Sequence, residues 1–392
     1  MNWNDKVAKN VQEVSFSGIR KFFDLASSMK DVISLGVGEP DFAAPDKVLH
    51  ACIESLGRKE TSYTSNWGLL ELRTEISKLY KNRYDLDYNP TDEVMVTVGV
   101  SEAITIVMQT LLNPGDEVLI PDPAYLAYPA CVRLVGGNPV LVPTFAHDEF
   151  KLKVEELEKK ITPKTKAILI GYPNNPTGTV MEKESLEKIA GFVKEHDLIV
   201  ISDEIYCDLT YEGAHTCFAS LPDMRERTIV LNGFSKSYAM TGLRVGYVCG
   251  PKEIMQSLYK VHQYEILCAS STSQYGAITA LQECDADVKM MFDEYAERRE
   301  IVYNALISMG LDVFKPKGAF YMFPDISCTG MDDEEFCDRL LCEERVGMVP
   351  GSCFGLQGRN HVRISYAASR ENLIEAMKRM AAFVEKYKSN KQ

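Results

Sequence analysis

"VLNGFSKSYAMTGLRVGY", residues 230–247, starts with an apolar run, ends with a second one, and carries a Ser-Lys pair and an arginine between them. The two runs, 230–234 and 245–247, are rich in β-branched and aromatic residues, which favours strands. The segment between them is too short for a crossover helix, so two strands follow one another here directly. An isolated lysine in such a loop is usually solvated surface charge, and the rest of the chain decides whether Lys236 has another role.

Short apolar runs alternate with amphipathic segments from about residue 93 to residue 250. Two intervening segments, 101–112 and 182–196, repeat apolar side chains with the period of a helix. Strands that are apolar on both faces and separated by helices are typical of a mostly parallel sheet covered by helices. The sequence therefore predicts an α/β fold around a mostly parallel seven-stranded sheet, with one antiparallel strand because the last two runs lack a helix between them. The seven runs are 93–99, 117–123, 138–144, 167–173, 198–206, 228–234 and 245–250.

The pattern changes after about residue 285. Long helical patterns cover residues 293–310 and 370–388, and strand-like runs cover 318–326 and 360–367. This mixture predicts a smaller α+β domain, and the first 45 residues, too few for a domain of their own, are expected to join it. We therefore expect a large domain over residues 46–284 and a small domain made of residues 1–45 and 285–392.

The composition restricts the class of function. With 392 residues, 45% hydrophobic side chains and a formal net charge of −13, the chain resembles a soluble globular protein and lacks the basic surface of a nucleic-acid binder. Its 11 cysteines are scattered without metal-ligand spacing, which favours a reducing compartment and predicts no metal site. The first residues contain no apolar signal core, and no apolar run is long enough to span a bilayer. We expect a cytoplasmic protein with no membrane or nucleic-acid partner.

Polar side chains follow four of the predicted strands at the point where each strand ends. In open α/β sheets, ligands bind beyond the carboxyl ends of the strands, so we expect these side chains to lie together. Each also has a simpler interpretation: Ser101 as a helix N-cap, Asp203 as a cap of the next segment, "NNPTG" as a turn, and Lys236 and Arg244 as surface charges. The side chains are Ser101 after 93–99, Asn175 after 167–173, Asp203 and Tyr206 in 198–206, and Ser235 and Lys236 after 228–234.

Taken together, these side chains fit one ligand. That ligand carries a phosphate, a ring nitrogen that stays protonated, a phenolic oxygen and an aldehyde. Pyridoxal 5'-phosphate has all of these groups, and proteins usually bind it through a lysine and an acidic partner of the ring nitrogen. The phosphate suits Ser101, Ser235, Arg244 and the helix N-terminus at Val100; the ring nitrogen suits Asp203; the phenolic oxygen suits Asn175 and Tyr206; the aldehyde suits Lys236.

The chain resembles the class I and II aminotransferases of fold type I over nearly its whole length. Residues 17–26 and 31–42 are similar to the branch that holds aspartate and aromatic aminotransferases. Together with these, residues 261–274 resemble the N-acetyl-diaminopimelate aminotransferases of that branch. The stretches that carry the resemblance are "SLGVGEPDF" (34–42), "YTSNWGLLELR" (63–73), "YPNNPTG" (172–178), "SDEIY" (202–206), "FSKSYAMTGLRVGY" (234–247) and "HVRISYA" (361–367).

The resemblance implies roles for these residues toward pyridoxal phosphate. Lys236 bonds the cofactor aldehyde and later moves the proton at the substrate Cα, while Asp203 keeps the ring nitrogen protonated. Asn175 and Tyr206 donate hydrogen bonds to the phenolic oxygen. Tyr125 stacks on the ring face, or is a packed loop aromatic.

The resemblance also implies substrate contacts and a partner subunit. Arg363 clamps the substrate α-carboxylate bidentately, helped by Asn175 and the backbone of Gly38. Tyr63 reaches the phosphate bound by the neighbouring subunit. The resemblance thus implies a homodimer with its active sites at the subunit interface.

The substrate is less closely defined than the reaction. The resemblance implies a ping-pong aminotransferase with aspartate or an aromatic amino acid as donor and 2-oxoglutarate as acceptor. N-acetyl-diaminopimelate or alanine as donor, and a C-S or β-lyase on the same scaffold, remain open alternatives. No arginine stands out for a second substrate carboxylate, because we expect Arg20, Arg298 and Arg299 to be solvated charges on a loop or helix surface.

Overall fold

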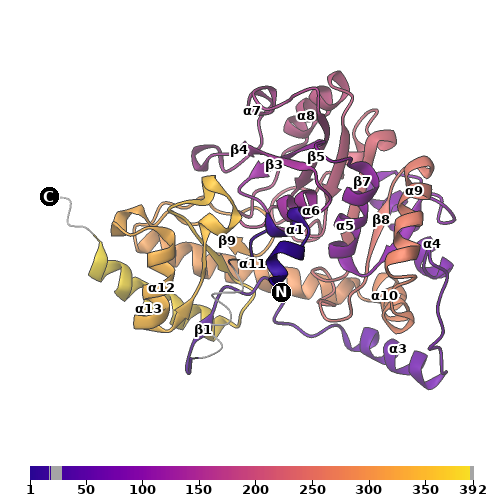
Figure 1. Ribbon diagram of the computed structural model, residues 1–392. Helices are drawn as coiled ribbons and strands as arrows, with labels where there is room; N and C mark the ends of the chain where they lie inside the picture. Colours follow the sequence, from indigo (N-terminus) through magenta and orange to yellow (C-terminus); the bar gives the residue numbers. More distant parts are fainter. Residues whose placement is uncertain (17, 19–28, 389–392) are drawn as a thin grey trace.

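A seven-stranded sheet forms the centre of the larger part of the molecule (Figure 1). The computed structural model describes residues 1–16, 18 and 29–388. β8 is antiparallel to both of its neighbours, β2 and β7, and the other strand pairs are parallel. The predicted mostly parallel sheet with one antiparallel strand is confirmed. In sheet order the strands are β2 (Val94–Thr97), β8 (Gly246–Cys249), β7 (Thr228–Gly233), β6 (Ile199–Asp203), β5 (Thr165–Gly171), β3 (Glu117–Asp122) and β4 (Asn138–Pro143).

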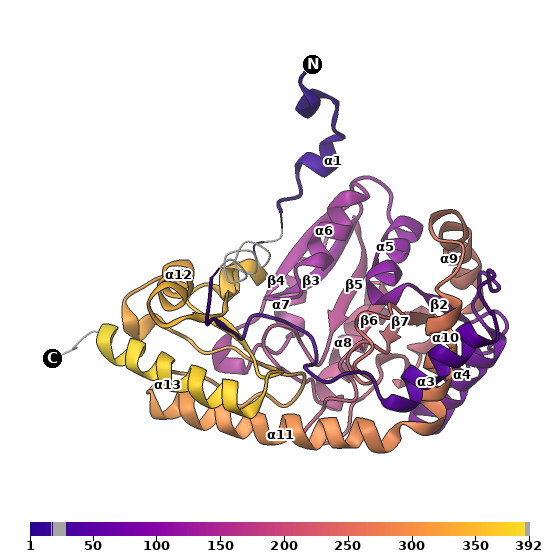
Figure 2. The same cartoon turned by 90° about the horizontal axis from the view of Figure 1, so that it is seen from below.

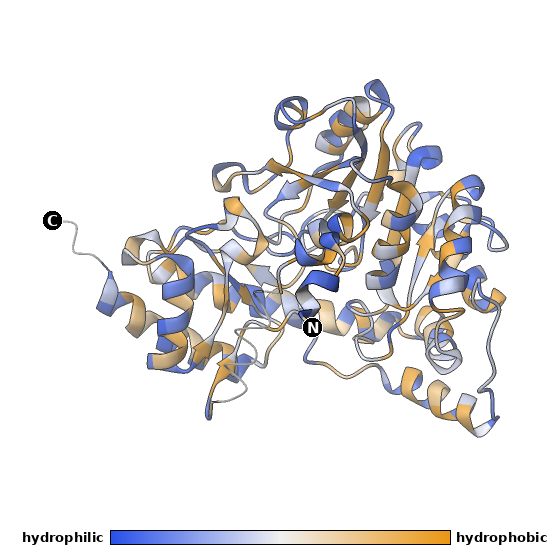
Figure 3. Ribbon diagram, viewed as in Figure 1, coloured by the Kyte–Doolittle hydropathy of each residue, from blue (hydrophilic) through white to orange (hydrophobic). Residues whose placement is uncertain are grey.

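Helices cover both faces of this sheet because its strands are apolar on both sides. Leu169 and Ile201 pack in one hydrophobic cluster with α5 (Gly99–Leu111). Ile168 and Val200, the neighbours of those residues in the chain, pack in a second cluster with α8 (Lys183–Glu195). Figure 3 shows the apolar colour along the central strands and the polar colour on outer helix faces. The other helices of this part are α3 (Asp46–Gly57), α4 (Leu70–Tyr84), α6 (Ala127–Leu134), α7 (Val154–Glu158), α9 (Lys252–Glu265) and α10 (Ser271–Glu283).

The C-terminal residues build a second core next to the sheet. α11 (Asp285–Ser308) and α13 (Arg370–Tyr387) run side by side along one edge of the molecule (Figure 2). β1 (Ile33–Ser34) pairs in parallel with β10 (Val346–Gly347), so an N-terminal segment joins this part. The predicted division into domains at residues 45/46 and 284/285 stays a prediction. The remaining α-helices and strands of the described residues are α1 (Lys9–Gln12), β9 (Tyr321–Met322), α12 (Asp333–Glu344), β11 (Val349–Pro350) and β12 (Val362–Ser365), with β12 between β11 and β9 in an antiparallel sheet.

The expectation that Arg298 and Arg299 are solvated is wrong. Arg298 is 5% exposed and donates to Asp41 Oδ1 at 2.7 Å and to Glu294 Oε1 at 2.8 Å. Arg299 is 7% exposed and donates to the carbonyl oxygen of Pro316 at 2.9 Å. The two arginines lie on the side of α11 that faces the N-terminal segment and the 316–317 loop, where acidic and carbonyl partners compensate their burial. Arg20 lies outside the described residues.

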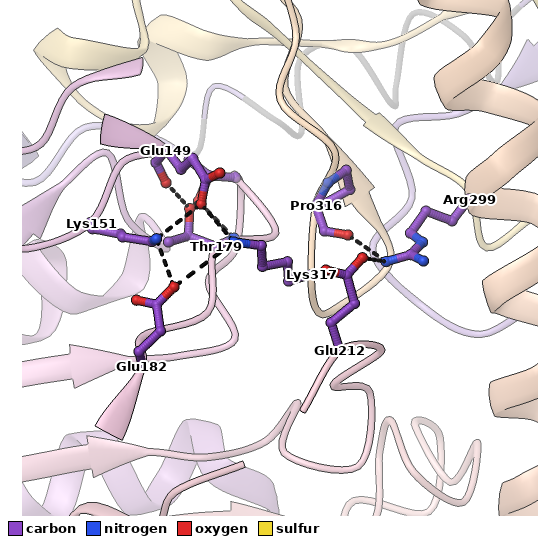
Figure 4. A network of polar contacts seen from close by, with 9 residues as sticks. Glu149, Lys151, Thr179, Glu182, Glu212, Arg299, Pro316 and Lys317 are labelled. Carbon is purple, nitrogen blue, oxygen red and sulfur yellow. Dashed lines mark hydrogen bonds and ion pairs between the residues drawn. The ribbon is translucent and has the colours of Figure 1, made fainter. Parts of the chain in front are cut away.

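The loop at Pro316 and Lys317 connects the two cores through polar contacts (Figure 4). On one side of this loop, Arg299 is held by Pro316 and Glu212, and on the other side Lys317 donates to Glu149 at 3.0 Å. Lys151 bridges Glu149 and Glu182 at 3.0 and 2.7 Å in the same network.

None of the described helices combines the length and the apolar character that crossing a lipid bilayer requires.

Candidate active site

A cavity of about 860 Å³ opens at the carboxyl ends of β5, β6 and β7. Its wall combines residues from the sheet, the N-terminal segment and β12, which brings together groups far apart in the sequence. Tyr63 does not line it and is 81% exposed. The predicted site residues in its wall are Gly38, Val100, Ser101, Tyr125, Asn175, Asp203, Tyr206, Ser235, Lys236, Arg244 and Arg363.

The first turn of α5 forms one end of the cavity. The helix starts at Gly99 with Val98 as its N-cap, so the simpler interpretation of Ser101 as the N-cap is wrong. No side chain of the N-cap residue bonds the first amides, and such amides together with the helix dipole attract an anion. The glycine is required here: its φ is +70°, and a Cβ would lie 2.8 Å from Nη2 of Arg244. Amides, the Ser235 hydroxyl and a guanidinium therefore meet around a place suited to a phosphate.

Asp203, at the end of β6, forms the base of the cavity. Its Oδ2 accepts a 2.7 Å hydrogen bond from the Tyr128 hydroxyl, and its Oδ1 accepts from the Ile205 N–H at 3.2 Å. Burial raises the pKa of Asp203 to about 6, although both hydrogen bonds oppose the shift. A cationic ring nitrogen placed against this carboxylate would stabilise its ionised form. The Asp203 carboxylate is therefore a suitable hydrogen-bond acceptor for the N–H of a protonated pyridine ring.

Tyr128 is a site residue that the sequence did not reveal. It lies on α6 and lines the cavity with its hydroxyl against Asp203. Gly171, at the end of β5, makes room for it, because a Cβ there would lie 2.5 Å from the Tyr128 hydroxyl oxygen. The presence of a second tyrosine in residues 123–129 was the only sequence signal for this site residue, and it did not indicate that the hydroxyl contacts a carboxylate.

Lys236 follows β7 and extends into the cavity. Its Nζ donates to the carbonyl oxygen of Gly38 at 2.6 Å. Burial lowers the pKa of Lys236 to about 8; the positive charges of Arg363 and Arg244 add to the shift, and the carboxylates of Glu39 and Asp203 oppose it. At that pKa about a tenth of the amine is neutral at pH 7, against about 0.03% for an exposed lysine. Lys236 is therefore not solvated surface charge, since its setting favours the nucleophilic form.

Arg363 presents a fixed guanidinium from β12. Nη1 donates to Asn175 Oδ1 at 2.9 Å and Nη2 donates to the carbonyl oxygen of Gly36 at 2.5 Å. The guanidinium carbon lies 4.6 Å from the Tyr321 ring centre, and the side chain is 2% exposed. Each of these nitrogens carries a second N–H, so the fork can also hold a carboxylate.

The aromatic residues around this fork complete the wall. The hydroxyl groups of Tyr206 and Tyr321 lie 2.6 Å apart, and Tyr321 is a second residue whose role the sequence did not reveal. A Cβ on Gly38 would lie 2.6 Å from the Tyr321 hydroxyl oxygen, so a larger residue there would push into the cavity wall. Tyr125 is half-buried and packs edge-on against Tyr128, with the ring centres 5.5 Å apart.

Comparison with known proteins identifies the class to which this fold and site belong. A family model described as aminotransferase class I and II matches residues 30–380. The chain is 49% identical over 376 residues to the putative aminotransferase YugH of Bacillus subtilis (strain 168). This alignment covers 96% of this chain and 97% of that protein. It is 48% identical over 370 residues to an aspartate aminotransferase of Pyrococcus abyssi, with coverages of 94% and 95%. The solved structure of an aromatic aminotransferase from Pyrococcus horikoshii matches with a TM-score of 0.89 and 45% identity, over 94% of this chain and 99% of that one.

The chain belongs to the aminotransferase class I and II family. It is accordingly an enzyme that moves an amino group from an amino acid to a 2-oxo acid.

Proposed function

We propose that the cavity binds pyridoxal 5'-phosphate and uses it to transfer an amino group between an L-amino acid and a 2-oxo acid. The observation that carries this proposal is the meeting, in one cavity, of a buried carboxylate, a lysine with a lowered pKa and an anion cradle at a helix N-terminus. Bound there, the cofactor supplies an aldehyde for the substrate amine and a ring that withdraws electrons from the substrate Cα. Its holders would be Val100, Ser101, Ser235 and Arg244 at the phosphate, Asp203 at the ring nitrogen, Asn175 and Tyr206 at the ring oxygen, Tyr125 at the ring face and Lys236 at the aldehyde.

The residues of the chain divide the remaining work. Arg363 binds the substrate α-carboxylate and fixes its orientation, with Asn175 holding one arm of the guanidinium and the Gly38 backbone beside it. Lys236, as a neutral amine, accepts the proton from the substrate Cα and returns one from the same side. Its contact with Gly38 O keeps the amine within the cavity.

We propose aspartate or an aromatic amino acid as donor and 2-oxoglutarate as acceptor. The names of the relatives support these two donors. Apolar side chains line the cavity beside the cationic ones, which favours the aromatic donor. The apolar wall residues are Val37, Val100, Ile104, Leu126, Pro173 and Ile205.

Single amino acids mixed with the holoenzyme in the absence of an acceptor test this proposal, with the cofactor absorbance as readout. Conversion to the aminated cofactor by an aromatic amino acid, aspartate or glutamate supports it and ranks the donors. Conversion only by N-acetyl-diaminopimelate or alanine would replace the donor. Release of pyruvate and ammonia from cysteine-like substrates would replace transfer by a lyase reaction.

We also propose that the enzyme is a cytoplasmic homodimer in which Tyr63 reaches the phosphate site of the partner. The exposure of Tyr63 and of a row of apolar side chains on α3 supports a subunit interface there, and 11 free cysteines support a reducing compartment. Sedimentation equilibrium measures the assembly, and a monomer at enzyme-assay concentrations would refute the dimer. The α3 side chains are Leu49, Ile53 and Leu56.

Replacement of Arg363 by lysine should weaken both half-reactions. A single ammonium cannot hold Asn175, Gly36 and a carboxylate together, so we expect kcat/KM to fall about 100-fold for the amino acid and for the oxo acid. Steady-state kinetics with both substrates measure this effect. Arg370→Lys is the control, because Arg370 is 42% exposed in its ion pair with Glu294. Unchanged kinetics for Arg363→Lys would place the carboxylate elsewhere.

Replacement of Tyr128 by phenylalanine should change the titration of Asp203. Loss of a donor to the ionised carboxylate raises the pKa of Asp203 relative to wild type, so the acidic limb of the kcat profile moves to higher pH. We expect kcat near pH 7 to fall about tenfold. The control is Tyr295→Phe, which removes a buried hydroxyl that has no hydrogen-bond partner among the described residues. Identical pH profiles for wild type and Tyr128→Phe would contradict the role of Tyr128.

A further inference from the structure

A buried carboxylate and imidazole lie beneath the first turn of α5. One oxygen of Glu102 accepts the Val98 N–H at 2.5 Å, and the other lies 2.5 Å from Nδ1 of His262. The side chain of His262, on α9, is 0% exposed and that of Glu102 is 7% exposed. Because a carboxylate can only accept, Nδ1 carries the proton of this contact. Nε2 of His262 is buried without a partner among the described residues, so Glu102 provides the single described polar contact of this imidazole.

The orientation of Glu102 decides which amides of α5 remain available. The N–H groups at the start of a helix have no partner within the helix, and in α5 they belong to residues 98–101. Glu102 accepts from the amide of Val98, which stands before the helix, and does not occupy the amides of Val100 and Ser101, two residues of the cavity wall. A carboxylate on the same turn is itself an anion, and without a second contact it could turn toward these amides.

We propose that His262 is a positioning residue for cofactor binding: it holds the Glu102 carboxylate on the Val98 amide and so keeps the following amides free for the phosphate. This inference rests on the proposed function, because it assigns the amides at Val100 and Ser101 to the cofactor phosphate. His262 itself lies on α9, outside the cavity wall, and acts through Glu102. Removal of the His262 side chain frees the Glu102 carboxylate to compete with the cofactor phosphate for these amides. It also removes the packing of the buried imidazole.

Binding of pyridoxal phosphate and of pyridoxal to the apoenzyme distinguishes these two effects, because pyridoxal lacks the phosphate. For His262→Leu we expect the Kd of pyridoxal phosphate to rise about tenfold, the size of the loss of a helix-capping interaction, with the Kd of pyridoxal changing by less than about twofold. The affinity for inorganic phosphate, measured by its competition with the cofactor, should fall in parallel with that for pyridoxal phosphate. His262→Asn should retain most of the affinity, since its amide N–H₂ can donate to Glu102 from the position of Nδ1.

Two further variants sharpen the test. Glu102→Gln in the His262→Leu background removes the competing charge and should recover most of the affinity for pyridoxal phosphate. Leu258→Ala is the matched control, because Leu258 is fully buried one turn earlier on α9 and its loss should lower stability without changing the ratio of the two Kd values. If His262→Leu does not fold, His262→Ala, which introduces no new apolar bulk, carries the same expectation.

Equal weakening of pyridoxal phosphate and pyridoxal, or weakening of neither, would overturn the inference and leave His262 a packing residue. Lack of recovery in the double variant would overturn it as well. A wild-type protein that binds neither ligand would instead refute the proposed function, so the two failures are distinguishable.

Discussion

Lys236→Ala should lower the rate of amino transfer by at least about 10,000-fold, the upper range for a positioned proton-transfer group, in a protein that remains folded. The side chain ends in the cavity with Gly38 O as its hydrogen-bond acceptor, so alanine leaves space without breaking a core contact between strands. Single-turnover absorbance measures the chemical step, and thermal unfolding measures the fold. Lys252→Ala is the control, because that lysine is 61% exposed in a surface ion pair. Near-normal turnover of Lys236→Ala would remove Lys236 from the mechanism.

The same lysine has a signature in the apoenzyme. With a pKa of about 8, its amine becomes neutral as the pH rises through 8, about 2.5 pH units below an exposed lysine. The rate of modification of Lys236 by an amine-directed reagent should therefore reach half its maximum near pH 8, as measured by peptide mass spectrometry. A midpoint above pH 10 would contradict the cavity environment.

Asp203→Ala should produce the second-largest effect. Without the carboxylate nothing in the base of the cavity stabilises a protonated ring nitrogen, so we expect kcat to fall about 1,000-fold while the cofactor still binds weakly. Glu204→Gln is the matched control: the neighbouring carboxylate turns away from the cavity and contacts Ser202 and His215. It should lower thermal stability and leave the turnover of folded protein nearly intact. Equal losses of activity in both variants would show a general effect of charge removal.

Much of the fold could be predicted because each strand of the central sheet is a run of apolar residues, which can be recognised in the sequence without knowledge of its neighbours in the sheet. The antiparallel direction of β8 followed from the short connection at residues 234–245, which leaves no length for a crossover. In contrast, the strand predicted over residues 318–326 is reduced to Tyr321–Met322, because pairing with β12 extends over only two residues. Local sequence could not show how far a partner strand reaches.

The cavity residues could be predicted where their chemistry is specific, as for Lys236 and Asp203. Tyr128 and Tyr321 were missed because a tyrosine can serve many structural purposes. Its role depends on the residue that its hydroxyl contacts, which is Asp203 for Tyr128 and Tyr206 for Tyr321. Arg298 was expected to be solvated since its ion-pair partner Asp41 lies 257 residues away in the chain. Long-range partners of this kind are fixed by packing and leave no local signal.

The pairing of β1 with β10 and the contact of Arg363 with Gly36 have a consequence for synthesis on the ribosome. The seven strands of the large sheet are complete once residue 249 has emerged, and sequential folding favours their early assembly. The wall that surrounds Lys236 needs β12, which emerges more than 100 residues later. Until then Arg363, one of the positive charges that lower the pKa of Lys236, is missing from the wall, so we expect the lysine to reach its lowered pKa only after β12 has docked.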